Sequence, residues 1–219
     1  NEQFFSAAGR HTLRLQIADS ATNLDSFGIQ FGASPPARRV IFQDNFEGYA
    51  NTDTLRLRGG WSIVNGSGEP SVAWSIQHSG SEPRPGFFAG MNDNYLIADS
   101  GQNQRARTDE ALVSPMIDCR GFSRVRLLFA NNIAFNGHND SPQNCDIDVN
   151  VFDEASNQWS SQWATVVHWE RHNGNVTARE LVSLASWADG KRIRLRWRFH
   201  EAKWDHWWAL DNVQVTGEG

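Results

Sequence analysis

Apolar and polar residues alternate along much of this chain. Residues 191–200 read Lys-Arg-Ile-Arg-Leu-Arg-Trp-Arg-Phe-His, so the apolar side chains fall on one face and the arginines on the other. A period of two predicts a half-buried β-strand, because successive side chains of an extended backbone point to opposite sides. Residues 124–130 and 146–152 show the same pattern and predict two further strands, each with one apolar and one polar face.

Residues 209–215 also alternate and predict a strand near the end of the chain. Asp211 shares its parity with Val213 and Val215, so the pattern predicts that its carboxylate points inward. An inward carboxylate needs a cation, an arginine or several N–H donors around it. Asp211 is therefore a candidate for binding a cation, pairing with an arginine or accepting several N–H hydrogen bonds.

Helical periodicity is scarce. Residues 179–187 are interpreted as a strand that leads into a loop over 188–190. Short strands separated by Gly, Asn, Pro and Ser clusters are typical of an all-β, two-sheet antiparallel sandwich. Parallel βαβ units would need crossover helices that the sequence does not predict.

The adjacent prolines near residue 35 indicate a domain boundary. Residues 33–38 are rich in Pro, Ala and Ser and are predicted to form a linker. Residues 1–32 contain two strand-like runs and form an N-terminal β segment. Residues 39–219 form the main β domain.

Charge and hydropathy narrow the possible partners. The chain has 20 basic and 25 acidic residues, a net charge of −5, which weighs against nucleic acid as a partner. No run of eighteen apolar residues occurs, so no membrane insertion is expected. No Gly-x-Ser-x-Gly, His-Glu-x-x-His or phosphate-loop motif is present, and we expect no enzymatic activity.

Tryptophan is over-represented, with ten residues among 219. A small domain cannot bury ten indoles fully, so some are expected at the surface, where flat aromatics contact sugars or proteins. Trp197 lies on the apolar face of its strand and Trp61 is expected in the core. For the others, packing over a sandwich edge and stacking on sugar rings both remain open.

The arginines of residues 192–198 cannot lie beside one another without partners. Two interpretations stay open: a ladder with aspartates of a neighbouring strand, or a polar groove for acidic or neutral sugars. The candidate carbohydrate-binding residues are Trp159, Trp163, Trp204, Trp207, Arg194, Arg196 and Asp148. Whether Cys119 and Cys145 form a disulfide also stays open.

Four short motifs occur in order along residues 40–216. They are Asp-x-Phe-Glu-Gly at 44–48, Leu-Ile-Ala-Asp-Ser at 96–100, Leu-Val-Ser-Pro at 112–115, and Trp-Ala-Leu-Asp-Asn-Val at 208–213. Together they resemble the MAM-like or cleaved-adhesin type jelly rolls of bacterial secreted proteins. The resemblance implies a non-catalytic, extracellular jelly-roll module attached to proteases, glycosidases or adhesins. Residues 8–29 are similar to the last hairpin of a carbohydrate-binding β-sandwich; alternatively, they add strands to the jelly roll or end an Ig-like domain.

The same resemblance implies a structural calcium ion where the opening and closing strands meet. Its candidate ligands are Asp44, Glu47, Asp99 and Asp211. In the alternative, Asp211 caps a turn or pairs with an arginine. We therefore predict a secreted or cell-surface accessory module that binds a polysaccharide or glycan and is stabilised by Ca2+. The alternative is a protein–protein adhesion or structural domain that contacts a surface protein.

Overall fold

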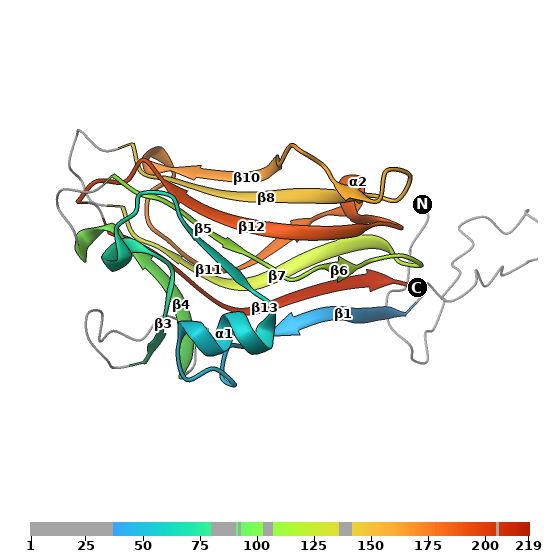
Figure 1. The fold of residues 1–219 in the computed structure, drawn as a ribbon, viewed down its shortest axis with the longest axis horizontal. Helices are drawn as coiled ribbons and strands as arrows, with labels where there is room; N and C mark the ends of the chain where they lie inside the picture. Colours follow the sequence, from blue (N-terminus) through green and yellow to red (C-terminus); the bar gives the residue numbers. More distant parts are fainter. Residues whose placement is uncertain (1–36, 80–90, 92, 103–106, 136–141, 205) are drawn as a thin grey trace, which may run out of the picture. The chain divides into compact units, whose positions relative to one another are not determined.

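In the computed structural model, the described residues are 37–79, 91, 93–102, 107–135, 142–204 and 206–219 (Figure 1). They form two antiparallel β-sheets, which confirms the predicted all-β jelly-roll sandwich. The predicted N-terminal segment over 1–32 and most of the linker over 33–38 lie outside the described residues. Within the described part, no helix is long and apolar enough to cross a membrane.

Sheet A contains the last strand of the chain at its centre. Its order is β11–β7–β13–β4–β3, and β1 also pairs with β13. The strands of sheet A are β1 (Arg38–Asp44), β3 (Ser75–His78), β4 (Asn94–Asp99), β7 (Ser123–Ile133), β11 (Val176–Ser183) and β13 (Trp207–Glu218).

Sheet B contains the arginine-rich strand at its centre. Its order is β10–β8–β12–β5–β2, with β6 pairing with β12 and β9 with β8. The strands of sheet B are β2 (Ser62–Asn65), β5 (Asp109–Val113), β6 (Ile117–Asp118), β8 (Asn144–Asp153), β9 (Gln158–Trp159), β10 (Ala164–Glu170) and β12 (Arg192–His200). Consecutive strands β7 and β8 lie in different sheets, as do β12 and β13.

The core between the sheets follows the period of two. In β12 every second residue is buried, which confirms the predicted apolar face. Trp197 from this strand packs against Trp61 and Phe129, with ring centroids 5.8 and 6.1 Å apart. Both predicted core tryptophans are therefore confirmed, and Trp74 and Trp208 are buried with them.

Two helices lie among the connections. Helix α1 (Thr52–Gly59) was not predicted, although Asn51 and Thr54 form a capping box at its start and Gly60 ends it with a φ of 70°. Helix α2 (Ala185–Ala188) replaces the end of the strand predicted over 179–187. Three short 3₁₀ turns, η1 (Pro70–Val72), η2 (Ser100–Gln102) and η3 (Arg171–Asn173), complete the elements.

Strand β13 contains a bulge that changes which residues face the core. Asp211 is opposite Ala130 of β7 but Gln214 is opposite Leu128, so β13 carries one extra residue. Asn212 lies inside this bulge and has a φ of 53°.

The bulge reverses the side-chain parity of β13. Trp208 and Leu210 before it, and Val213 and Val215 after it, all belong to the core between the sheets. The predicted common face of Asp211 and Val213 is therefore wrong, because simple alternation does not hold across an extra residue. Asp211 lies on the outer face of sheet A, yet its side chain is fully buried.

The two cysteines do not form a disulfide. Cys119 precedes β7 and Cys145 lies in β8, which belong to opposite sheets. Both side chains are buried, and burial raises the pKa of Cys119 to about 12. The fold therefore holds both residues in its core without a covalent link.

Candidate functional site

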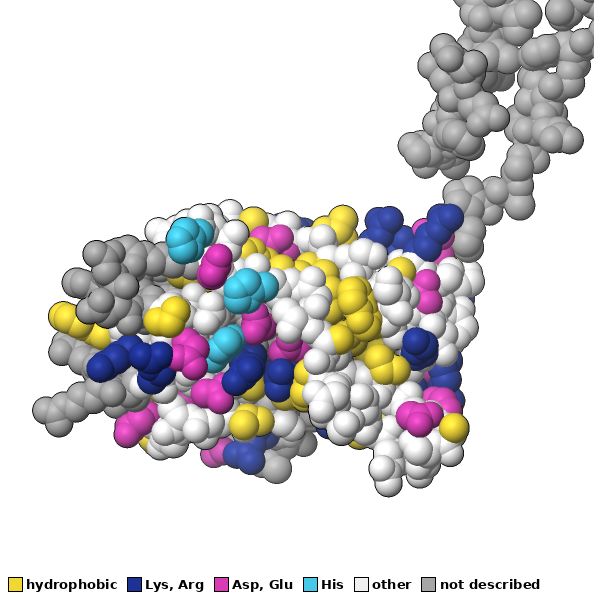
Figure 2. All heavy atoms as spheres, turned by 90° about the horizontal axis from the view of Figure 1, so that it is seen from above, with side chains coloured by type: hydrophobic (Ala, Val, Ile, Leu, Met, Phe, Trp, Pro, Cys, Tyr) yellow, Lys and Arg dark blue, Asp and Glu magenta, His cyan; other side chains and the backbone are white. Residues whose placement is uncertain are grey.

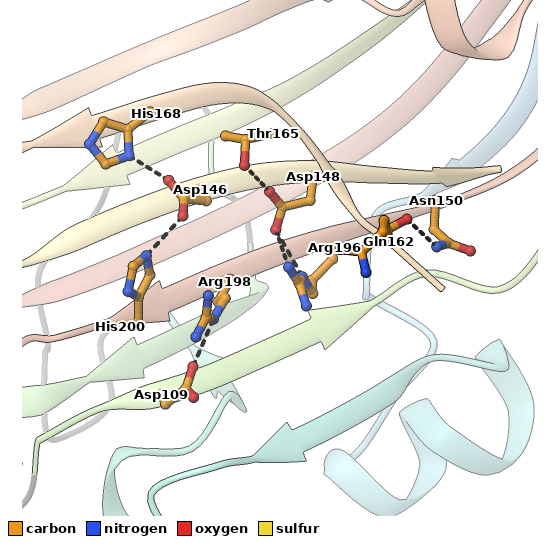
Figure 3. A network of polar contacts seen from close by, with 10 residues as sticks. All are labelled: Asp109, Asp146, Asp148, Asn150, Gln162, Thr165, His168, Arg196, Arg198 and His200. Atoms are coloured by element: carbon orange, nitrogen blue, oxygen red, sulfur yellow. Dashed lines mark hydrogen bonds and ion pairs between the residues drawn. The ribbon is translucent and has the colours of Figure 1, made fainter. Parts of the chain in front are cut away.

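The outer face of sheet B carries charged side chains close together. Seen from above, on the side of β10 and β8 in Figure 1, acidic, basic and histidine side chains lie next to a hydrophobic patch (Figure 2). Figure 3 shows the network that connects them across β10, β8, β12 and β5. We call this surface the polar face of sheet B.

Asp148 of β8 is a buried member of the network. It lies directly opposite Arg196 of β12 and Thr165 of β10, and residues directly opposite share a face of the sheet. Arg196 donates to one carboxylate oxygen at 2.8 Å and Thr165 donates to the other at 2.7 Å (Figure 3). Asp148 is only 1% exposed. Its predicted polar orientation is confirmed, but its partners remove it from solvent.

Asp146, two residues earlier on β8, lies between two histidines. Nδ1 of His168 is 2.5 Å from one carboxylate oxygen and Nε2 of His200 is 2.8 Å from the other (Figure 3). Burial raises the pKa of Asp146, but the contacts with His200 and His168 outweigh burial and hold that pKa below its usual value.

Three of the four arginines of β12 form ion pairs. Arg196 pairs with Asp148, Arg198 with Asp109 at 2.7 Å, and Arg192 with Glu154. The hydrogen bond from Arg198 holds the pKa of Asp109 below its usual value. The interpretation of the stripe as a ladder with aspartates of neighbouring strands is thus correct for Arg196 and Arg198, whereas Arg192 pairs with a glutamate.

Arg194 has a different environment. Its guanidinium lies over the ring of Trp159, 4.0 Å from the ring centre. The ring centre of Trp163 is 5.7 Å from the same guanidinium. Arg196 lies 4.5 Å from the same Trp163 ring, so two indoles and two guanidinium groups alternate along the face. This arrangement brings the predicted Trp and Arg candidates into direct contact.

Asn150 fixes the chain segment that carries Trp163. Its amide NH₂ donates to the carbonyl oxygens of Ser160 at 2.8 Å and Gln162 at 2.9 Å. These bonds hold the connection between β9 and β10 against β8. Asn150 is only 1% exposed, and its own Oδ1 has no hydrogen-bond partner.

The structure therefore brings together five of the seven predicted carbohydrate-binding residues: Trp159, Trp163, Arg194, Arg196 and Asp148. Trp204 lies in the connection between β12 and β13 and is 46% exposed. Trp207 lies on the outer face of sheet A, where its Nε1 donates to Asn132 at 2.7 Å.

The candidate residues chosen from the sequence leave out other members of the face. They are Asp109, Asn150, Thr165, His168 and His200, whereas Asp146 is one of the aspartates expected to pair with the arginines. Asn150 and His200 share the outward parity of residues already selected, so the alternation itself was the available signal. Thr165 and His168 could not be found in this way, because β10 has a register shift between Thr165 and Val167.

Among the metal candidates, Asp44 is engaged by protein donors. Its carboxylate accepts hydrogen bonds from the backbone N–H of Phe46 at 2.9 Å, the Tyr49 hydroxyl at 2.8 Å and Trp61 Nε1 at 2.8 Å. Asp44 is opposite Val213, whose side chain lies in the core. Asp44 thus joins the Asp-x-Phe-Glu-Gly motif to the core residue Trp61.

The other three metal candidates accept hydrogen bonds from backbone N–H groups. Glu47 accepts from the backbone N–H of Asn94, and Asp99 accepts from Gly101 at 2.9 Å. Asp211 accepts from the backbone N–H of its neighbour at 2.5 Å. Across the described ranges, no three His, Cys, Asp or Glu side chains form a group that could hold a metal ion.

Asp44 also lies in a pocket lined by amide side chains, whose oxygens could bind a cation. This polar pocket of about 380 Å³ between β1 and β13 is lined by Asp44 together with Gln43, Asn45, Tyr49, Arg179, Asn212, Val213 and Gln214. Amide oxygens are acceptable calcium ligands, but the guanidinium of Arg179 opposes a cation. Among the described residues the four candidate carboxylates do not form one group, and calcium stays a prediction.

The fold is similar to that of known adhesin domains. Two cleaved adhesin domains of Lys-gingipain from Porphyromonas gingivalis align with 81% and 82% of this chain and with 98% and 99% of their own length. Their TM-scores are 0.54 and 0.53 at 15% and 16% identity, a likeness that shows a shared fold. A family 22 carbohydrate-binding module of Clostridium thermocellum xylanase 10B aligns at a TM-score of 0.46 and 12% identity, which is too distant to carry an argument. No family model and no curated protein matches the sequence.

The cleaved-adhesin part of the predicted resemblance is therefore supported at the level of the fold. The MAM-like part stays a prediction.

Proposed function

We propose that this chain is a non-catalytic, extracellular module that binds a polysaccharide or glycan on the polar face of sheet B. One observation carries the proposal: Trp159 and Trp163 lie on the same face as Arg194, Arg196 and Asp148. A sugar ring presents apolar C–H groups on its faces and hydroxyls at its edge. Indole rings flanked by fixed charged groups match both features.

Pre-organised polar groups favour a sugar over an apolar protein surface. Asp148 and Arg196 are already held by each other and by Thr165, so little side-chain entropy would be lost on binding. The exposed large apolar residues of the described chain come from separate elements: Val40, Val64, Met116, Leu181 and Trp204. The alternative of protein–protein adhesion rests on the adhesin-like fold and is tested by the same experiment.

The pairing of the carboxylates favours binding over hydrolysis. Glycoside hydrolysis needs two carboxyl groups, one of which is protonated to donate to the leaving oxygen. Asp148 and Asp109 pair with arginines, and the pKa of Asp109 and of Asp146 is lowered rather than raised. Such carboxylates are poor general acids.

We expect the Trp163→Ala variant to bind polysaccharide about tenfold or more weakly, because truncating an anchoring tryptophan costs roughly 2 kcal/mol or more. Affinity electrophoresis in gels containing soluble xylan, mannan, β-glucan or polygalacturonate measures this. Trp204→Ala is the matched control, since it removes an exposed indole outside the polar face. If Trp204→Ala alone abolished binding, or if no polysaccharide retarded the wild type while a surface protein did, the proposal would be wrong.

We also propose, from the family resemblance alone, that calcium stabilises the module. The expected result is a markedly lower melting temperature in EDTA, restored by excess CaCl₂ but not by MgCl₂, because binding to the folded state raises stability by mass action. Circular dichroism melting curves measure it. An unchanged curve in EDTA would contradict the proposal and leave the protein donors around Asp44 as the stabilising contacts.

A further inference from the structure

One arginine of the β12 stripe has no carboxylate partner. Ion pairs are formed by Arg192, Arg196 and Arg198. Among the described residues, no ion pair joins Arg194 to an acidic side chain. The residue opposite Arg194 on β8 is Asn150, whereas Arg196 and Arg198 lie opposite Asp148 and Asp146. The neutral amide of Asn150 thus occupies the position of β8 where an aspartate would have extended the ladder to Arg194.

Part of the Arg194 side chain is closed to solvent. Its Nε is buried and makes no hydrogen bond, and the guanidinium lies over Trp159. The same burial lowers the pKa of Arg194. A ring face attracts a cation but does not neutralise its charge, so the site retains a positive charge and unused donors.

The nearest carboxylates already have partners. Asp148 is held by Arg196 and Thr165, and Asp146 is held by two histidines. An incoming anion would therefore meet the cation of Arg194 beside the ion pair of Arg196 and Asp148. This local balance contrasts with the net charge of −5 of the chain.

We propose that Arg194 binds the carboxylate of a hexuronic acid residue, so that the ligand of the polar face is an anionic polysaccharide. This inference rests on the proposed carbohydrate-binding function and specifies its ligand. A guanidinium presents parallel N–H donors that match a planar carboxylate. The indole of Trp163, whose ring centre is 5.7 Å from the Arg194 guanidinium, supplies apolar surface beside the carboxylate.

The test compares polygalacturonate with its fully methyl-esterified form, which has the same sugar backbone without the charge. We expect the wild type to prefer polygalacturonate, and Arg194→Gln to weaken that binding about ten- to a hundredfold, as for loss of a charge-assisted hydrogen bond. Arg179→Gln, which removes an exposed arginine on sheet A, is the matched control and should bind like the wild type. Arg194→Lys keeps the charge without the planar donors and should fall between. Melting curves of all variants show whether each one is folded.

The outcomes separate this inference from the proposed function. Equal binding of both polymers, or unchanged binding by folded Arg194→Gln, would overturn the uronate assignment and leave carbohydrate binding intact. If the protein preferred sulfated carrageenan to polygalacturonate, the group bound by Arg194 would be a sulfate. This result would likewise overturn the uronate assignment. Binding of no polysaccharide at all would overturn both.

Discussion

Replacing Trp197 by alanine should lower the free energy of unfolding by about 3–5 kcal/mol. The indole is fully buried at the centre of β12 and touches the rings of Trp61 and Phe129, so its removal leaves a cavity in the middle of the sandwich. Chemical denaturation followed by tryptophan fluorescence, with circular dichroism as a second probe, measures the loss.

Two variants make this experiment specific. Trp197→Phe should cost less than Trp197→Ala, because the smaller ring fills part of the cavity and removes a buried Nε1 that has no hydrogen-bond partner. Trp204→Ala should change stability by less than about 1 kcal/mol, since that side chain is 46% exposed. Equal losses at positions 197 and 204 would contradict the placement of Trp197 in the core.

Asp44→Ala should lower the free energy of unfolding by about 2–4 kcal/mol, because three donors lose one common acceptor. Of these donors, Trp61 Nε1 belongs to a side chain only 2% exposed. Asp53→Ala, in the first turn of α1, is the matched control and should cost below about 1 kcal/mol. Urea unfolding of the three proteins measures the difference.

Tyrosine titration gives an independent readout of the same contact. Burial, the hydrogen bond to Asp44 and the charge of Asp44 together raise the pKa of Tyr49 to about 12. Asp44→Ala removes the last two causes, so the tyrosinate absorbance of Tyr49 should rise at lower pH. If the stability loss appeared only in CaCl₂ and vanished in EDTA, Asp44 would act as a calcium ligand instead of a hydrogen-bond acceptor for Trp61.

The sheets were predictable wherever one face is apolar and no residue is inserted. β12 is the clear case, because nine residues alternate without interruption and Trp197 is buried on the apolar face. Alternation does not predict the faces of β13, because Asn212 is an extra residue with a positive φ. The order of polar and apolar positions does not reveal such a residue. Helix α1 was missed because it lacks an apolar stripe, although Asn51 and Gly60 mark its ends.

The candidate site was predictable in kind but not in its pairings. Alternation placed Arg194, Arg196 and Asp148 on outward faces, and the strand order then brought β8 beside β12. Which arginine pairs with which carboxylate depends on register, and register depends on both sheets closing around the core. The stacking of Trp163 on the arginines depends further on Asn150, whose hydrogen bonds to a distant loop leave no trace in a local pattern.

The bulge of β13 has a consequence for sequence change in this strand. Deleting Asn212 would restore simple alternation, because Asp211 and Gln214 would then be two residues apart, like Ala130 and Leu128 opposite them, and Val213 and Val215 would keep their places in the core. Inserting or deleting one residue in the regular part of the strand would instead exchange the inward and outward positions beyond it. In a comparison of distant sequences, a one-residue gap at Asn212 would therefore mark a chain that lacks the bulge but keeps the same core positions.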